Sequence, residues 1–285
     1  MDRAATDQES NVVKVAPSGT RLYVQHHGNM HMDARRMAGV PDYFQRASNR
    51  LPLDLWLPCP CLTFLIRHPS GNILFDVGCS EDWAETWKAT GIAEMVPYDE
   101  WTAEQQLGPM LERQGLGVDD IDLVVASHLH MDHCGKLDLF QRARADILIQ
   151  RTEYEGAMAI PAPGRGGYVT SQYRDLDVKW RLIEGDLDLV VGVQVLSLPG
   201  HSYGSQGLAV RLEVAGLFVL ASDAAQVAPN LNDPPIASPN VYDSLRWRES
   251  IRRLQHLRDH EGALIVCGHE PSQFAQLRLS PDYYT

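Results

Sequence analysis

Four side chains that can bind a metal ion lie close together near the middle of the chain. The segment from His128 to His133 has the sequence HLHMDH, in the pattern H-x-H-x-D-H, directly after an apolar stretch. Neutral imidazole nitrogen and carboxylate oxygen are good ligands for zinc and similar divalent ions. The chain has only 11 histidines, so three of them in this pattern are improbable as an accident. The spacing therefore predicts a metal site rather than a polar loop whose histidines happen to cluster.

Three further candidate ligands lie where apolar runs end. His201 follows Leu-Pro-Gly, Asp223 ends the run GLFVLAS, and His269 follows ALIVCG. A single histidine at a strand end is more often structural or capping than a ligand. The H-x-H-x-D-H segment alone, however, supplies too few ligands for two metal ions. Three such groups in addition to the H-x-H-x-D-H segment favour a centre for two metals.

The elements that must position these residues alternate along the chain. Strands are predicted over 20–28, over 60–68 and 73–78 as a hairpin, over 121–127 and 146–150, in succession over 178–200, over 207–223 as a hairpin, and over 262–270. Helices are predicted over 80–115 with a break near Pro97, over 152–158 and over 241–260, while 29–58 is predicted as a loop or short helix and 161–170 as a Gly/Pro-rich loop. Strands in both halves with helices between them fit two sheets packed face to face, with helices outside.

The length, charge and cysteine content of the chain limit the kinds of protein that it can be. We expect one α/β domain over 19–285 after a flexible leader over 1–18. The net charge of −12 disfavours nucleic acid as a partner. The chain has no apolar run long enough to span a bilayer, and its start lacks the features of a secretory signal, so no membrane association and a cytoplasmic location are expected. An odd number of cysteines, five, indicates reduced thiols rather than a disulfide framework.

The order of these motifs resembles that of the metallo-β-lactamase superfamily. The H-x-H-x-D-H segment is followed by Pro-Gly-His-Ser around His201, by a strand-end Asp223 and by Gly268-His269. Within that superfamily the chain is most similar to the N-acyl-homoserine-lactone and γ-butyrolactone hydrolases. The similarity extends over ASHLHMDHCG, ILIQRTEYEGA, VKWRLIEGD and GHEPSQFAQLRLSPDYYT. It implies an αββα sandwich, as a single domain, with metals at one edge between the sheets.

The resemblance also implies how the ligands are divided between two divalent ions, expected to be Zn²⁺. One ion would be held by His128, His130 and His201, the other by Asp132, His133 and His269, with Asp223 bridging them. A water shared by two such ions becomes hydroxide near neutral pH and attacks the ester carbonyl of a lactone ring. Asp132 and Asp223 would thereby take part in catalysis, and the substrate would be a small-molecule lactone, with quorum quenching as the implied role.

One position departs from the family pattern. The acyl-homoserine lactonases usually have a tyrosine three residues after the bridging aspartate, where this chain has Gln226. Glutamine can donate a hydrogen bond to the substrate, but it is shorter and has no phenol. Gln226 is therefore a candidate catalytic residue, and an aromatic or polar lactone such as 4-pyridoxolactone is an alternative substrate.

Other residues carry weaker predictions. Met30, Met32 and Met131 are candidates to line an apolar substrate pocket, with plain core packing as an equal alternative, and Tyr168 is a candidate substrate contact. Asp76 is predicted either to accept a hydrogen bond from a ligand imidazole or to act only as a turn residue. Cys134 and Cys267 are predicted to be buried packing residues.

Three other functions are compatible with parts of these patterns. A thioesterase like glyoxalase II, or another hydrolase on this fold, is the main alternative. A binding module that has lost catalysis would lack a ligand, and none is missing. A flavin-linked diiron oxidoreductase would need H-x-E-x-D-H, whereas this chain has His130 at the glutamate position. A homodimer is the default expectation for the assembly.

Overall fold

Two β-sheets form the centre of the molecule. The computed structural model describes residues 13–38 and 56–285. The first sheet has the order β1-β2-β3-β4-β5-β8, from β1 (Arg21–Asp33), β2 (Trp56–His68), β3 (Gly71–Phe75), β4 (Leu123–Val125), β5 (Asp146–Gln150) and β8 (Lys179–Ile183). The second has the order β13-β12-β11-β10-β9, from β9 (Leu187–Val190), β10 (Val193–Ser197), β11 (Gln206–Leu212), β12 (Gly216–Ser222) and β13 (Leu264–Cys267).

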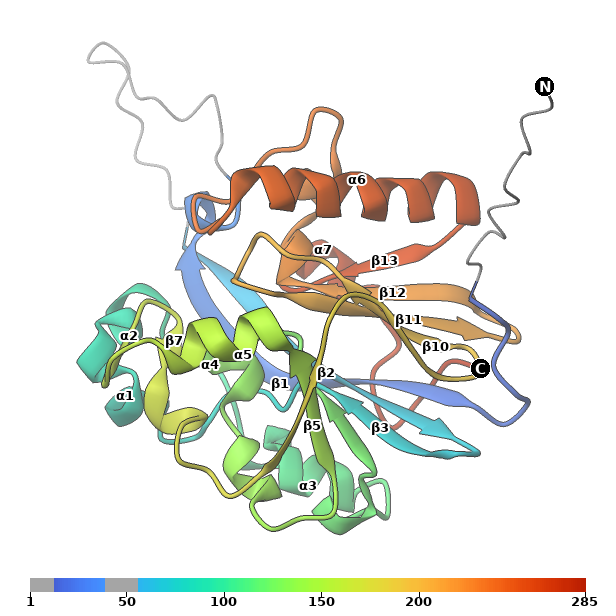
Figure 1. Cartoon of the computed structure of the whole chain (residues 1–285), viewed down its shortest axis with the longest axis horizontal. Coiled ribbons are helices and arrows are strands. Elements are labelled where there is room, and N and C mark those ends of the chain that lie inside the picture. Colours follow the sequence, from blue (N-terminus) through green and yellow to red (C-terminus); the bar gives the residue numbers. More distant parts are fainter. Residues whose placement is uncertain (1–12, 39–55) are drawn as a thin grey trace, which may run out of the picture.

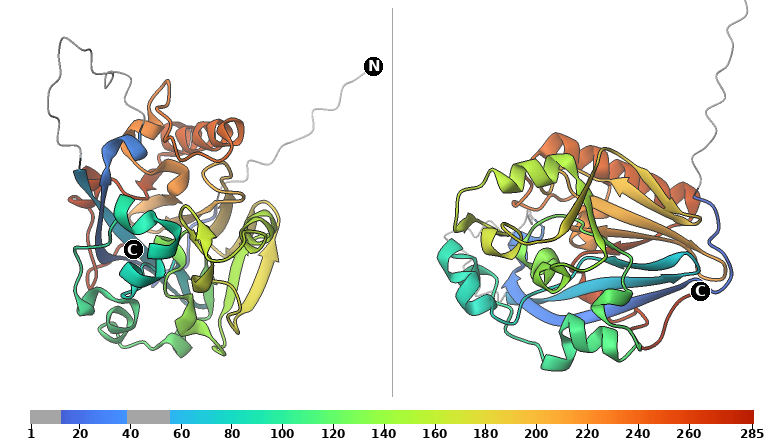
Figure 2. Two further views of the ribbon diagram at one scale, coloured as in Figure 1. Left: turned by 90° about the vertical axis from the view of Figure 1, so that its left-hand side faces the viewer. Right: turned by 60° about the horizontal axis from the view of Figure 1, so that its bottom comes forward.

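Helices cover the outer face of each sheet. The long helix α6 (Ser244–Glu261) lies along the second sheet, and the shorter helices that precede it in the chain lie on the side of the first (Figure 1; Figure 2, right). The shorter helices that precede α6 are α1 (Trp83–Thr86), α2 (Ile92–Met95), α3 (Leu107–Glu112), α4 (Met131–Cys134) and α5 (Arg151–Met158). This layering confirms the predicted αββα sandwich. In the described ranges, no helix combines the length and the apolar character needed to cross a membrane.

Strand β2 shows how the sequence produces these layers. Phe64 and Ile66 belong to the apolar cluster between the two sheets, together with Leu208 of the second sheet. Leu65, which points the opposite way, packs in the cluster beneath α3. Because both faces of the strand are covered, its apolar residues are consecutive rather than alternating. A third cluster joins the second sheet to α6 through residues such as Trp247.

The first strand is longer than predicted. β1 continues to Asp33, and β2 begins at Trp56, so the predicted loop or short helix over 29–58 is wrong at both ends; its central part, 39–55, lies outside the described residues. The register of β1 shifts between His26 and Asn29. Gly28 in this bulge has φ 99°, and a Cβ there would lie 2.5 Å from the carbonyl oxygen of Glu100. This irregularity interrupts the alternation of residues on which the prediction depended.

Other boundaries follow from local hydrogen bonds. The hairpin of β2 and β3 is confirmed. The predicted helical region 80–115 consists of several short helices. Helix α6 starts at Ser244 rather than near residue 241, because the Asp243 carboxylate caps its first turn by accepting from the backbone N–H of Leu245 and Arg246. The loop over 161–170 contains the two-residue strands β6 (Gly164–Arg165) and β7 (Tyr168–Val169).

The described part of the expected leader contacts the second sheet. Ala16 is buried, and its backbone N–H donates to the carbonyl of Arg211 at 2.8 Å. Residues 1–12 lie outside the described residues. The C-terminal residue lies near the same region, where the carbonyl of Thr285 accepts from the backbone N–H groups of Val214 and Ala215.

Candidate metal centre

All seven predicted ligand side chains meet at one edge of the sandwich. The H-x-H-x-D-H segment follows β4 of the first sheet and continues into α4. The other three ligands follow strands of the second sheet: His201 after β10, Asp223 after β12 and His269 after β13. Six of the seven side chains are buried and His130 is partly buried. Strand ends from both sheets therefore enclose the site, as the sequence predicted.

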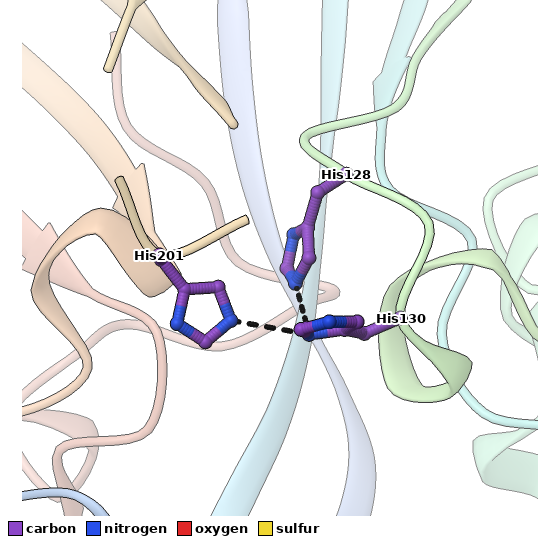
Figure 3. A group of neighbouring side chains, drawn as sticks. All are labelled: His128, His130 and His201. Carbon is purple, nitrogen blue, oxygen red and sulfur yellow. Dashed lines mark hydrogen bonds between the residues drawn. The ribbon is translucent and has the colours of Figure 1, made fainter. Parts of the chain in front are cut away.

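Three histidines form the first group of ligand atoms. His130 Nδ1 lies 3.0 Å from His128 Nε2 and 3.1 Å from His201 Nε2 (Figure 3). Asp223 approaches the same group, with its Oδ2 3.3 Å from His201 Nε2. A proton on His130 Nδ1 can form a hydrogen bond to only one of these two histidines at a time. A cation among three neutral imidazoles would use the lone pairs of all three.

The second group contains both aspartates. Asp132 Oδ2 lies 3.3 Å from His133 Nε2 and from His269 Nε2. Asp223 Oδ1 lies 3.2 Å from His133 Nε2 and 3.1 Å from His269 Nε2. Asp223 thus directs one oxygen at each group. His133 Nε2 and Asp223 Oδ1 are buried without a hydrogen-bond partner among the described residues, as expected for atoms that ligate a cation.

Burial and neighbouring charges set the protonation states of these groups. Burial lowers the pKa of His130 and of His201 to about 4, so both imidazoles are neutral near pH 7. Burial alone would raise the pKa of Asp132 and Asp223, but neighbouring imidazoles, His133 among them, hold both pKa values well below the usual range. Neutral imidazoles and ionised carboxylates are the forms that bind divalent ions.

The two histidines nearest the carboxylates behave differently. Burial opposes their protonated forms, but Asp132 and Asp223 outweigh it and raise the pKa of His133 and His269 well above the usual value. Protons on these imidazoles neutralise the buried carboxylates. A divalent ion would supply the same compensation and release those protons.

A polar network lies behind the predicted ligands and contacts His133. Asp76 Oδ2 lies 2.8 Å from His133 Nδ1, and Asp76 also accepts from the backbone N–H and the hydroxyl of Ser127. Of the two readings of Asp76, the structure thus supports the hydrogen bond to a ligand imidazole. Ser222 Oγ donates to Ser127 Oγ at 2.9 Å. Asp76 and Ser222 have positive φ angles of 61° and 47°, which are unfavourable for these residue types and occur here next to the site.

Sequence reasoning missed Glu153, which joins the loops that carry the ligands. Its Oε1 accepts from the backbone N–H of Leu129 and from the Tyr168 hydroxyl. Its Oε2 accepts from Ser202 Oγ and the backbone N–H of Gly204. Glu153 is fully buried in the first turn of α5, where it occurs in the run RTEYEGA as an ordinary helical glutamate. A glutamate in an otherwise exposed turn gives no local sign of these contacts.

A cavity of about 420 Å³ opens beside the ligand atoms. The four predicted pocket residues line it: Met30, Met32, Met131 and Tyr168. The Tyr168 hydroxyl donates a hydrogen bond to Glu153 and is therefore occupied. The centroid of the Tyr168 ring lies 4.5 Å from that of the His130 ring. Gln226 also lines the cavity, and its Nε2 donates to Asp223 Oδ2 at 2.8 Å. The sequence did not indicate further lining residues, among them Arg36, Asn240, Tyr203 and Tyr242.

All five cysteines are free thiols with buried side chains. Cys134 packs in the cluster beneath the first sheet's helices and Cys267 in the cluster beneath α6, as predicted. Burial raises the pKa of Cys267 to about 12, so its thiol is protonated near neutral pH. None of the three groups of candidate ligands among the described residues includes a cysteine.

Comparisons with known proteins agree with this geometry. The model of the metallo-beta-lactamase superfamily matches residues 56–269. An N-acyl homoserine lactonase of Bacillus cereus is 32% identical over 246 residues, covering 82% of this chain and 88% of that protein. The N-acyl homoserine lactonase AiiB of Agrobacterium fabrum is 29% identical over 283 residues, covering 93% of this chain and 98% of that protein.

A solved structure gives the same relationship. The structure of an N-acyl homoserine lactone hydrolase, with the product N-hexanoyl-L-homoserine bound at its catalytic metal centre, superimposes with a TM-score of 0.77. It is 29% identical in sequence, and the alignment covers 96% of this chain and 100% of that one. The resemblance inferred from the motifs is thereby confirmed. The chain belongs to the metallo-β-lactamase superfamily, alongside its N-acyl homoserine lactonases.

Proposed function

We propose that this protein is a dinuclear metal-dependent hydrolase that opens the lactone ring of N-acyl homoserine lactones. The observation that carries the proposal is the placement of Asp223, whose two carboxylate oxygens face two separate groups of ligand atoms beside one cavity. The relatives named N-acyl homoserine lactonase, each matched over most of its length, support the substrate class. Quorum quenching follows as the role of such an activity.

The ligand sets proposed for the two ions follow the two groups of atoms. The first ion would be held by His128, His130, His201 and Asp223, and the second by Asp132, His133, His269 and Asp223. Five imidazoles and two carboxylates suit Zn²⁺, which is the metal we propose. Two such ions supply a water acidic enough to give hydroxide near pH 7 and stabilise charge on the carbonyl oxygen of the substrate.

The side chains of the chain itself hold and orient this centre. Asp76 fixes the ring of His133 by its hydrogen bond to Nδ1, and the backbone carbonyl of Pro60 lies 3.0 Å from Nδ1 of His269. Each contact leaves Nε2 free to face the ligand group. Gln226 donates to Asp223 Oδ2 and so orients the shared carboxylate. We therefore assign Gln226 a positioning role toward Asp223 in place of the expected direct contact with substrate.

The cavity walls suit an acyl chain. Met30, Met32 and Met131 line the cavity together with Ile92 and Val96. Thioether side chains adapt to apolar groups of different length, and burial of each methylene contributes about 0.8 kcal/mol. A volume of about 420 Å³ is within the range of pockets that take small organic ligands.

The proposal is tested by acid release from a lactone panel in a pH-stat. The panel contains acyl-homoserine lactones, γ-butyrolactone and an aromatic lactone, with S-lactoylglutathione as a thioester. The zinc-loaded protein, a chelated sample and Asp223→Asn are compared. We expect ring opening of acyl-homoserine lactones that requires metal and falls at least about 100-fold in Asp223→Asn. If the protein binds two metals per chain but opens only the thioester, the lactonase proposal is wrong and the glyoxalase-like alternative replaces it.

A further inference from the structure

Two arginines give the cavity a positive rim. Arg36 and Arg165 both line it, and of the described residues that line it the only acidic ones are the proposed ligands Asp132 and Asp223. Among the described residues, no carboxylate lies within ion-pair distance of Arg36 or Arg165; the carboxylate partner of neighbouring Arg35 is Asp33. The chain as a whole has a net charge of −12. Two arginines on the wall of one cavity contrast with this negative net charge.

The environment of Arg36 leaves its guanidinium poorly compensated. Its Nε is buried without a hydrogen-bond partner, and the contact of its Nη1 is with Met95 Sδ at 3.7 Å, a weak acceptor. Burial lowers the pKa of this guanidinium, and the nearby carboxylate of Asp33 offsets only part of that effect. A buried donor without an acceptor destabilises the protein, and a bound acceptor would offset this cost.

The backbone holds Arg36 in place. Arg36 ends a short 3-10 helix after β1, and its carbonyl oxygen accepts from Ser238 Oγ at 2.5 Å and from Asn240 Nδ2 at 3.1 Å. Asn240 itself lines the cavity. Two segments about 200 residues apart in sequence thus hold the backbone from which the Arg36 side chain extends.

We propose that Arg36, assisted by Arg165, forms a subsite for a carboxylate carried by the substrate's acyl substituent. A guanidinium binds a carboxylate through two parallel hydrogen bonds, which is stronger and more directional than contact with a neutral group. The apolar side chains of Met32, Ile92 and Val96 line the same cavity and suit the methylenes that would connect the carboxylate to the amide. The inference rests on the proposed lactonase function and narrows it to lactones with an anionic acyl chain.

The test compares three homoserine lactones with acyl chains of equal length: one ending in a carboxylate, one in its methyl ester and one in a methyl group. The readout is the ratio of kcat/KM for the carboxylate to kcat/KM for the ester. We expect a ratio of about 10 or more in the zinc-loaded protein, because charge-assisted hydrogen bonds contribute about 1.5–3 kcal/mol. Raising the salt concentration lowers this ratio, since part of the attraction is screened.

Matched variants assign the preference to the subsite. Arg36→Gln is expected to bring the ratio close to 1, and Arg36→Lys to keep part of it. Arg248→Gln removes the same charge at an exposed position of α6, outside the cavity lining, and is expected to keep the full ratio. Because kcat/KM for the carboxylate is divided by kcat/KM for the ester in the same variant, differences in folding or metal content cancel from the ratio.

The outcomes separate the two proposals. If the ester and methyl substrates are opened but the carboxylate has no advantage, the subsite is wrong and the lactonase function stands. If the carboxylate substrate keeps its higher kcat/KM in Arg36→Gln, another group causes the preference, and the inference is likewise overturned. If the zinc-loaded protein opens none of the three lactones, the proposed function fails, and the subsite built on it fails too.

Discussion

Asp223 connects the two groups of ligand atoms, and its immediate neighbours control its position. Its Oδ2 accepts from Gln226, while its Oδ1 faces His133 and His269. Gly268 passes so close that a Cβ there would lie 2.6 Å from Asp223 Oδ1. A side chain held this closely cannot shift to accommodate a change in one partner without affecting both groups.

Gln226→Leu tests the positioning role of the amide. The substitution removes the hydrogen bond to Asp223 Oδ2 but leaves all seven proposed ligands. We expect kcat/KM for acyl-homoserine lactones to fall about tenfold, from the loss of one hydrogen bond to a charged group, while two metals remain bound. The measurement pairs steady-state kinetics with metal analysis. The same substitution at exposed Gln276 is the control, and an unchanged kcat/KM in Gln226→Leu would contradict the role.

Asp76→Asn tests the support of His133. The variant keeps the size of the side chain but removes the charge that lies 2.8 Å from His133 Nδ1. We expect a 10- to 100-fold loss of zinc affinity, the usual effect of changing a carboxylate behind a ligand histidine. Competition with a chelator of known affinity measures it. Asp119→Asn, at an exposed position, should bind zinc as the native protein does; equal affinities in both variants would assign Asp76 a turn role only.

At the scale of elements, α5 holds together the loops around the site. Glu153 in its first turn accepts from a residue of β7 and from residues that follow β4 and β10. The ligands His128, His130 and His201 lie in two of these loops or next to them. A backbone hydrogen bond from the N–H of Met131 to the carbonyl of Gly167 joins two of these segments, and the buried carboxylate of Glu153 contacts all three.

Glu153→Gln is expected to disturb these contacts. The amide accepts through one oxygen only, and its NH₂ group faces donors in place of the second oxygen. We expect unfolding free energy to fall by about 2–4 kcal/mol and zinc affinity to fall with it. Denaturant unfolding of the zinc-loaded protein measures the first. Glu155→Gln, two residues along the same helix and exposed, is the matched control. A change no larger than that of the control would show that the loops are aligned by other contacts.

The elements differ in how far the sequence predicts them. The strand ends with their histidines and aspartates were predictable, because apolar runs and metal ligands are both local patterns. Glu153 and Arg36 were not, because Glu153 acts through partners 15 or more residues away and the surroundings of Arg36 within the described residues depend on the tertiary fold. The bulge at Gly28 likewise depends on Glu100, from a segment distant in sequence.

At the scale of the whole molecule, the site lies across the junction of the two sheets. The H-x-H-x-D-H segment belongs to the first sheet, whereas His201, Asp223 and His269 belong to the second. Two buried carboxylates in this junction depend on cations for compensation. Metal binding therefore acts on the packing of one half of the sandwich against the other, as well as on chemistry.

Removal of metal should accordingly destabilise the entire fold. An ion present at 1,000 times its dissociation constant stabilises the native state by about 4 kcal/mol, and domains of 150–250 residues change Tm by about 2–4 °C per kcal/mol. For two ions in this chain we expect chelation to lower Tm by at least about 10 °C, and added zinc to restore it. Asp223→Asn should show a smaller shift, since it holds metal less well. Calorimetry with and without chelator decides it: an equal Tm in both samples would mean that protons on His133 and His269 suffice to hold the sheets together.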